Sequence, residues 1–458
     1  MTLVPNHLRL LNGSKLLVLV FILGLFSSCG STRKTTKSRG TTPRTTTKKN
    51  TNRDRDRVRK VEWEEKNDDS KPPIEASSDK SPDKITIEKK DVYNVTYFIP
   101  LDANNYNNSA SASDRFVQYY AGMLVATDIL EKEGVSLNVN VVDEKKRKFS
   151  ILLDNDVDKN TDVIVGPYDR GDLKEAAEFG KKNEIPVISP WQASNKIAKD
   201  NPYYIQLRPN LDEHYYSIFE HIKDEFDAEN VFLIGRKSNI KDQKRIDKLQ
   251  EIAGDVWQQP GEAVINEFDV SLDSLNAGET AYDSIFIKDK TTVIVLPNWS
   301  FEDESFIYNA LRKLSVEKGM NKVVVYGMPI MLESNKISFD YYNALNMRVA
   351  RSKFVDEAHR DVQRFKRDFV NKYGALPSDD AYEGYDNLMF IGRNLKEYGK
   401  NFQYYLNQDQ GYYLQAGYRV EPTRRSSSDD NFEEFDYFEN KNVDILIFKN
   451  SKFTRSKK

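Results

Sequence analysis

The chain has 458 residues and a formal net charge of −3, but the charge is unevenly distributed along it. Residues 31–90 carry 18 Lys and Arg against 11 Asp and Glu (+7), whereas residues 91–458 carry 48 against 60 (−12). An acidic body repels phosphate backbones, which disfavours nucleic-acid binding, so we expect no nucleic-acid partner. The 368 residues from 91 onward exceed the usual size of one hydrophobic core, and we therefore expect two lobes.

Residues 1–28 are predicted to be a lipoprotein signal peptide. Arg9 and Lys15 precede the apolar run Leu16–Phe26, whose 11 residues are too few to span a bilayer but enough for a signal peptide. Small residues follow, and then comes Cys29, the only cysteine of the chain. The segment around it resembles a lipobox, with its Leu one position earlier than usual, so we predict acylation of Cys29. The alternative is a plain secretory signal.

Acylation of Cys29 would leave no free thiol, which excludes disulfides, thiol catalysis and cysteine-bound metal. The protein would then be lipid-anchored in the cell envelope. No acidic run follows Cys29, which favours the periplasmic side of the outer membrane.

Residues 29–90 are predicted to be the lipidated cysteine and a disordered tether. A tract rich in Thr, Lys and Arg is followed by alternating Arg and Asp and then by a stretch rich in Ser, Pro and Asp. Such a segment has too few apolar residues to offset the entropy lost on ordering. We interpret it as a spacer, with contact of its basic half with anionic headgroups or an acidic wall polymer as the alternative.

From Asn94 onward, short runs rich in Val and Ile alternate with amphipathic segments of helical length. Continuously apolar runs fit parallel strands that are covered on both faces, because a half-exposed strand would alternate apolar and polar residues. Strands alternating with helices imply right-handed crossovers and an open doubly wound α/β sheet. The predicted strands are 95–101, 137–142, 162–166, 186–189, 203–207, 231–235, 264–268, 293–296, 323–327, 432–438 and 443–448, and the predicted helices include 116–133, 173–183, 212–226, 242–253 and 301–318.

Several predicted strands end in a small or turn-forming residue followed by polar or aromatic groups. In open α/β sheets ligands bind beyond the carboxyl ends of the strands, so these loops are the expected binding site. The candidate ligand-binding residues are Tyr168, Asp169, Arg170, Trp191, Gln192, Ser194, Asn298 and Trp299.

Each candidate also has a structural interpretation. Trp191 either stacks on a ligand or closes the edge of its own lobe, and Trp299 holds the corresponding place in the second lobe. Asp169 and Arg170 either pair with a charged ligand or are solvated.

An ordered succession of segments resembles the type I periplasmic binding protein family. It runs through Val95–Leu101, Tyr119–Met123, Asp162–Pro167 and Ile185–Pro190 to Ala381–Asp386. It also resembles Bacteroidetes lipoproteins described as amino-acid transporter substrate-binding proteins. The resemblance covers 91–458.

The resemblance implies two doubly wound lobes, joined by a hinge, that close on a ligand. It divides the domain into lobe 1, about 91–211 and 355–405, and lobe 2, about 212–354 and 406–458. Family members that bind amino acids commonly use Ser or Thr hydroxyls in the loops after the third and fourth strands. This sequence departs there, because Tyr168, Asp169 and Arg170 replace the hydroxyl residues and Ser194 comes one position late.

No nucleophile elbow, phosphate loop, dinucleotide fingerprint or zinc-protease motif occurs, so we expect a protein without enzymatic activity, cofactor or metal. Two functions remain open. The first is a tethered receptor that closes on an amino acid, peptide or cell-wall fragment and serves a transporter permease or a sensor. The alternative is an envelope protein that regulates cell-wall synthesis through contacts with a partner such as a synthase.

Overall fold

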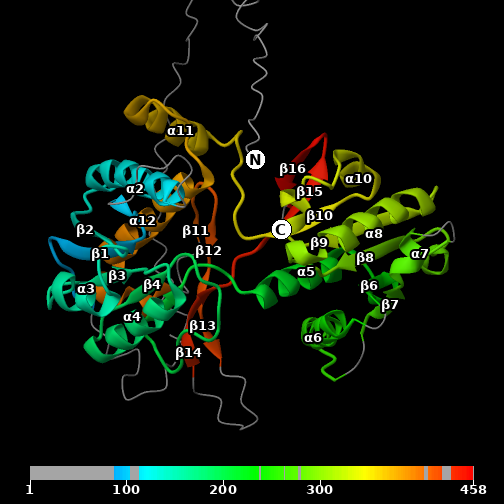
Figure 1. Cartoon of the computed structure of the whole chain (residues 1–458), viewed down its shortest axis with the longest axis horizontal. Coiled ribbons are helices and arrows are strands. Elements are labelled where there is room, and N and C mark those ends of the chain that lie inside the picture. The colour runs from blue at the N-terminus through cyan, green and yellow to red at the C-terminus, as the bar shows by residue number, and fades with distance from the viewer. Residues whose placement is uncertain are drawn as a thin grey trace, which may run out of the picture. The chain divides into compact units, whose positions relative to one another are not determined.

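The computed structural model describes residues 87–103, 113–236, 239–261, 264–276, 280–406, 411–424 and 435–456. They form two seven-stranded sheets covered by helices and one small two-stranded sheet (Figure 1). The expected class, two doubly wound α/β lobes, is confirmed. The predictions about the signal peptide, Cys29 and the tether fall on residues before 87 and so lie outside the described part. No helix among the described residues is long and apolar enough to cross a membrane.

The first sheet has the strand order β13-β14-β5-β4-β3-β1-β2. Its strands are parallel except for β13, which pairs antiparallel with β14. The central strands are short and fully buried, as their uninterrupted Val and Ile content predicts. The bounds are β1 Tyr93–Ile99, β2 Leu137–Asp143, β3 Val163–Val165, β4 Val187–Ser189, β5 Tyr204–Gln206, β13 Val420–Arg424 and β14 Phe435–Asn440.

The second sheet has the order β16-β15-β10-β9-β8-β6-β7. Strands β7 to β10 are parallel with β6, and β15 and β16 continue the sheet antiparallel. The bounds are β6 Val231–Arg236, β7 Asn266–Val270, β8 Thr291–Leu296, β9 Lys322–Gly327, β10 Arg348–Arg351, β15 Asp444–Lys449 and β16 Lys452–Arg455; β11 Gly411–Tyr412 and β12 Gly417–Tyr418 form the small sheet. The sequence interpretation missed β10, because four residues with arginine at both ends carry little apolar signal.

Two helical layers cover the first sheet. Helices α2 (Asp114–Lys132) and α12 (Asp379–Tyr398) cross closely on one face, with α11 (Arg360–Tyr373) packed beside them, and α3 (Phe149–Asp156) and α4 (Arg170–Asn183) cover the other face (Figure 1). Each face has its own buried apolar cluster. This is the three-layer arrangement expected of a doubly wound sheet.

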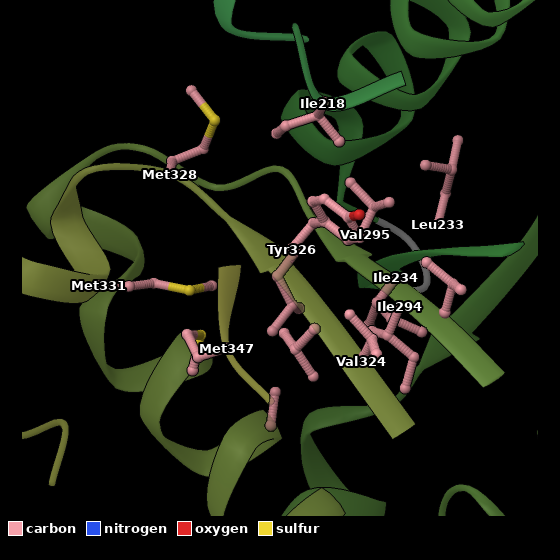
Figure 2. Packing of buried hydrophobic residues seen from close by; sticks show 14 of the residues in the cluster. Ile218, Leu233, Ile234, Ile294, Val295, Val324, Tyr326, Met328, Met331 and Met347 are labelled. Carbon is pink, nitrogen blue, oxygen red and sulfur yellow. The ribbon is translucent and has the colours of Figure 1, made fainter. Parts of the chain in front are cut away.

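One large apolar cluster surrounds the second sheet. Figure 2 shows Leu233, Ile294 and Val324 from three adjacent strands, with the methionines of the 328–347 segment beside them. Met331 packs directly on Gly327, since the missing side chain there leaves room for its sulfur. The helices of this lobe are α5 Leu211–Glu225, α6 Ile240–Trp257, α7 Leu272–Asn276, α8 Glu304–Glu317, α9 Ile330–Glu333 and α10 Phe339–Ala344; short 3-10 helices are η4 Ala228–Asn230, η5 Asp283–Ile285, η6 Phe301–Asp303 and, in the first lobe, η7 Gly399–Tyr404.

Within the described residues, the chain passes between the two sheets three times: from β5 to α5, from β10 to α11 and from β14 to β15. The sequence interpretation placed all of 406–458 in lobe 2. That boundary needs correction, because β13 and β14 extend the first sheet beside β5 and only β15 and β16 join the second. The error arose because a strand pair at a sheet edge has no local feature that identifies its sheet.

Buried polar contacts hold the crossing segments together. Glu439, at the end of β14, is fully buried and accepts hydrogen bonds from Gln206 and from the backbone and side-chain nitrogens of Asn210. Lys441 bridges Glu439 and Glu213 at 3.0 and 2.6 Å. Because each buried carboxylate has a cation or N–H donors, this cluster fixes the first crossing against the third.

Candidate functional site

The strand order of each lobe identifies where a ligand is expected. The core orders β2-β1-β3-β4-β5 and β7-β6-β8-β9-β10 reverse direction between β1 and β3 and between β6 and β8. Ligands of open α/β sheets bind beyond the carboxyl ends of the strands at such a switch point. Tyr168 follows β3, and Asn298 and Trp299 follow β8. We call these two places the first and the second switch-point edge.

Trp191 lies inside the first lobe. Only 5% of its surface is exposed, and its ring makes aromatic contacts with Phe116, Tyr119 and Tyr168 at centroid distances of 5.6, 5.2 and 5.9 Å. It therefore contributes to the packing of its own lobe, as the structural alternative stated. Tyr168 remains partly exposed above it.

The polar candidate side chains of the first edge make hydrogen bonds to other residues of the first lobe. Asp169 caps α4, because its carboxylate accepts hydrogen bonds from the backbone of Gly171 and Asp172. Gln192 donates to the Tyr168 carbonyl at 2.7 Å. Arg170 donates to the Ser194 hydroxyl at 3.0 Å, so two hydrogen bonds join the loop after β3 to the loop after β4.

Sequence reasoning missed Glu144, which lies just beyond β2 beneath this loop. It is buried, and its Oε2 accepts a hydrogen bond from the Tyr168 backbone at 2.9 Å. Its Oε1 has no hydrogen-bond partner among the described residues. Burial raises the pKa of Glu144 to about 7, more than the Tyr168 bond and Lys145 lower it. A lone glutamate after a strand gives no sequence signal of burial.

Two partly buried arginines and two buried aspartates form a cluster at the second edge. Arg236, at the end of β6, donates to both oxygens of Asp242 at 2.6 and 2.7 Å and to Asp303 at 2.6 Å. Arg245 pairs with the same two aspartates at 2.9 and 3.4 Å. Burial acts to raise the pKa of Asp242, but the bonds and charge of Arg236 outweigh it, and the pKa is lowered. We refer to these four residues as the Arg-Asp cluster.

The two candidates after β8 differ in exposure. Asn298 is fully buried; its Nδ2 lies 3.4 Å from Asp242, and its Oδ1 has no hydrogen-bond partner among the described residues. Trp299 is 52% exposed, and Ile240 at the start of α6 and Phe301 at the start of η6 are 74% and 60% exposed. The Lys241–Glu302 ion pair, at 3.1 Å, links the two segments that carry these side chains. We call Ile240, Trp299 and Phe301 the apolar patch.

A hollow of about 730 Å³ lies elsewhere, beside α5. Several polar side chains that line it are hydrogen-bonded to other residues: Tyr216 donates to Asp255 at 2.8 Å, and Tyr412 donates to Asp444 at 2.7 Å. His221 bridges the hydroxyls of Tyr326 and Ser456, and burial together with Arg348 lowers its pKa. None of the candidate ligand-binding residues lines this hollow.

The family model described as periplasmic binding protein matches residues 155–403, more than half of the chain and parts of both lobes. The chain belongs to the periplasmic binding protein family. Proteins of this family are extracytoplasmic and bind substrates for transport. No curated protein is significantly similar to the chain in sequence.

Solved structures share the fold at low identity. A protein described as a branched-chain amino acid ABC transporter from Rhodospirillum rubrum is 15% identical with a TM-score of 0.55, covering 80% of this chain and all of that one. LpoA from Haemophilus influenzae is 12% identical with a TM-score of 0.50, covering 81% of this chain and 59% of that one. At such identities the similarity shows the fold alone.

Proposed function

We propose that this protein is an extracytoplasmic receptor that closes its two lobes on a small molecule, an amino acid, a peptide or a cell-wall fragment. The observation that carries the proposal is the family match over 155–403, which includes two of the three crossing segments. In this mechanism each lobe supplies part of the contacts, and the ligand shifts the population toward the closed state. The bound form then serves a transporter permease or a sensor, without a catalytic step.

The candidate residues divide by position. We assign ligand contact to Tyr168, Arg170 and Trp299, which are all exposed. Trp191, Gln192 and Ser194 hold the first edge in shape through the bonds described above. Asp169 and Asn298 also have structural roles: Asp169 caps α4, and Asn298 contacts Asp242.

A thermal-melt screen of the purified protein tests the proposal. The panel consists of amino acids, short peptides, saccharides and muropeptides at millimolar concentration. A ligand at 100 times its dissociation constant adds about 2.7 kcal/mol to the free energy of unfolding, a shift of a few degrees for a chain of this size. We expect such a shift with one class and a smaller one in Trp299→Ala. Absence of a shift with every class contradicts the receptor function.

The second candidate is an envelope protein that regulates cell-wall synthesis through contacts with a synthase. One observation favours this function: polar groups at both edges already make hydrogen bonds within the protein instead of waiting for a ligand. They are those of Asp169, Gln192, Ser194 and the Arg-Asp cluster. If this function holds, the immobilised protein should retain cell-wall synthases from a membrane extract. A variant of the apolar patch should lose this retention, and the thermal screen should show no shift with any small molecule.

We also propose that Cys29 carries an acyl anchor, such as palmitate, in the outer membrane on its periplasmic side. The support is the position of this single cysteine after an 11-residue apolar run. Cys29→Ser is expected to move the protein from the membrane to the soluble fraction and to abolish incorporation of labelled palmitate. Unchanged fractionation would contradict the anchor.

A further inference from the structure

The Arg-Asp cluster leaves no free charge of its own at the second edge. All four carboxylate oxygens of Asp242 and Asp303 accept hydrogen bonds from the two arginines. The four side chains are each at most 14% exposed. A free amino acid brings a carboxylate and an ammonium, and a site that pairs them by charge must supply a cation and an anion. Recruiting either from this cluster would expose or strand a buried charge, which is costly.

What the second edge presents instead is the apolar patch. Three large apolar side chains, two of them aromatic, lie on the adjacent segments that follow β6 and β8. Clustered exposed apolar groups in a soluble protein mark a binding surface. Three residues cover far less than the roughly 800 Å² per partner of a stable protein interface, and this size fits a small ligand better.

The first edge also offers an aromatic surface. Tyr168 packs edge-on against Phe116 at 5.1 Å, and the Arg115 guanidinium lies 5.7 Å from its ring centre. These contacts restrict the ring while part of it stays exposed, so it forms a preorganised platform. Arg115 itself is paired with Asp380 at 3.1 Å.

We infer that the ligand is an uncharged, ring-bearing molecule, a neutral saccharide, bound through the exposed aromatic side chains of the two edges. Aromatic side chains supply a large apolar contact with a polar rim, which matches the apolar C–H face and peripheral hydroxyls of a pyranose. The inference rests on the proposed receptor function and specifies its substrate class. Arg170 keeps an exposed charge whose partner is a hydroxyl, and it is the residue through which an acidic ligand would bind instead.

Calorimetric titration of the full chain tests the inference. The probes are maltotriose, cellotriose and N,N′-diacetylchitobiose on one side and leucine, glutamate and lysine on the other. We expect binding of a saccharide, weakened about tenfold in Trp299→Ala and largely retained in Trp299→Phe, because the ring supplies the contact. Trp257→Phe is the matched control, since Trp257 packs on Phe219 at 6.1 Å in the same lobe. The affinity should change little with added salt.

The outcomes separate the two levels of the proposal. Binding of a free amino acid and no saccharide, weakened by Arg170→Gln or by salt, overturns the inference and leaves the receptor function standing. Saccharide binding that Trp299→Ala does not weaken overturns the assignment of the site. No binding of either set, with no thermal shift across the wider panel, overturns both and favours a protein partner.

Discussion

Gly384 of α12 lies directly against Tyr119 of α2: a methyl group on Gly384 would be 1.9 Å from the Tyr119 carbonyl oxygen. The contact is reciprocal, since a methyl group on Gly122 of α2 would be 1.9 Å from the Ala381 carbonyl oxygen. Two glycines therefore allow the helices of the first lobe to cross at backbone distance. Tyr119, held here, is one of the rings on which Trp191 packs.

Gly384→Ala is expected to destabilise the protein by about 1–3 kcal/mol, because backbone cannot move aside as a flexible side chain can. Urea unfolding measures the loss. Gly411→Ala is the matched control, since a methyl group there would meet only Tyr413 at 3.8 Å. Equal stability of the two variants would show that α2 and α12 are farther apart than described.

Glu144→Gln is expected to change the pH dependence of stability. With a folded pKa of about 7 against an ordinary 4.5, the buried carboxyl favours its protonated form. It therefore lowers the free energy of unfolding as the pH rises from about 4.5 to 7, and the effect is constant above that. Glutamine keeps an acceptor for the Tyr168 backbone without the charge.

Between pH 4.5 and pH 8, the free energy of unfolding of Glu144→Gln should rise by up to about 3 kcal/mol relative to that of the natural protein. Denaturant titrations at several pH values measure it. Glu178→Gln, the same change on the exposed side of α4, is the control for the lost charge. A difference between Glu144→Gln and the natural protein that does not vary with pH would refute the raised pKa.

Arg236→Ala is expected to cost about 3–5 kcal/mol, because it leaves Asp242 and Asp303 buried with only Arg245 as a cation. Lys241→Ala breaks an ion pair at the same edge whose partners are both 76% exposed, and it should cost no more than about 1 kcal/mol. Comparison of their unfolding free energies shows whether the Arg-Asp cluster supports the edge. Similar losses would mean that it does not.

Arg455→Gln is expected to loosen the crossing segments. Arg455, on β16, donates to Asp444 at 2.8 Å and to the carbonyls of Phe354 and Gln415 at 2.7 and 3.2 Å. Its loss should speed amide exchange in 352–356 and 443–456 by roughly tenfold or more, since bonds to a charged group contribute about 1.5–3 kcal/mol. Arg351→Gln, whose partner Glu333 lies at 3.9 Å, should have a smaller effect. Unchanged exchange in Arg455→Gln would exclude this role.

Much of the fold followed from local pattern. The uninterrupted Val and Ile runs at 163–165 and 293–295 predicted buried parallel strands, and both are central strands of their sheets. The turn residues that end the strands also predicted where the loops beyond their carboxyl ends begin. These features are readable because strand period and one-sided burial depend on neighbours within a few residues.

The sequence by itself determined the α/β class, the two-lobe division and the resemblance to periplasmic binding proteins. Only the tertiary structure decided that Trp191 is buried by Phe116 and Tyr119 from α2. It also decided that Arg236 pairs with Asp303, 67 residues away, and that β13 and β14 extend the first sheet. Such contacts depend on which distant elements pack together, and local periodicity carries no information about that choice.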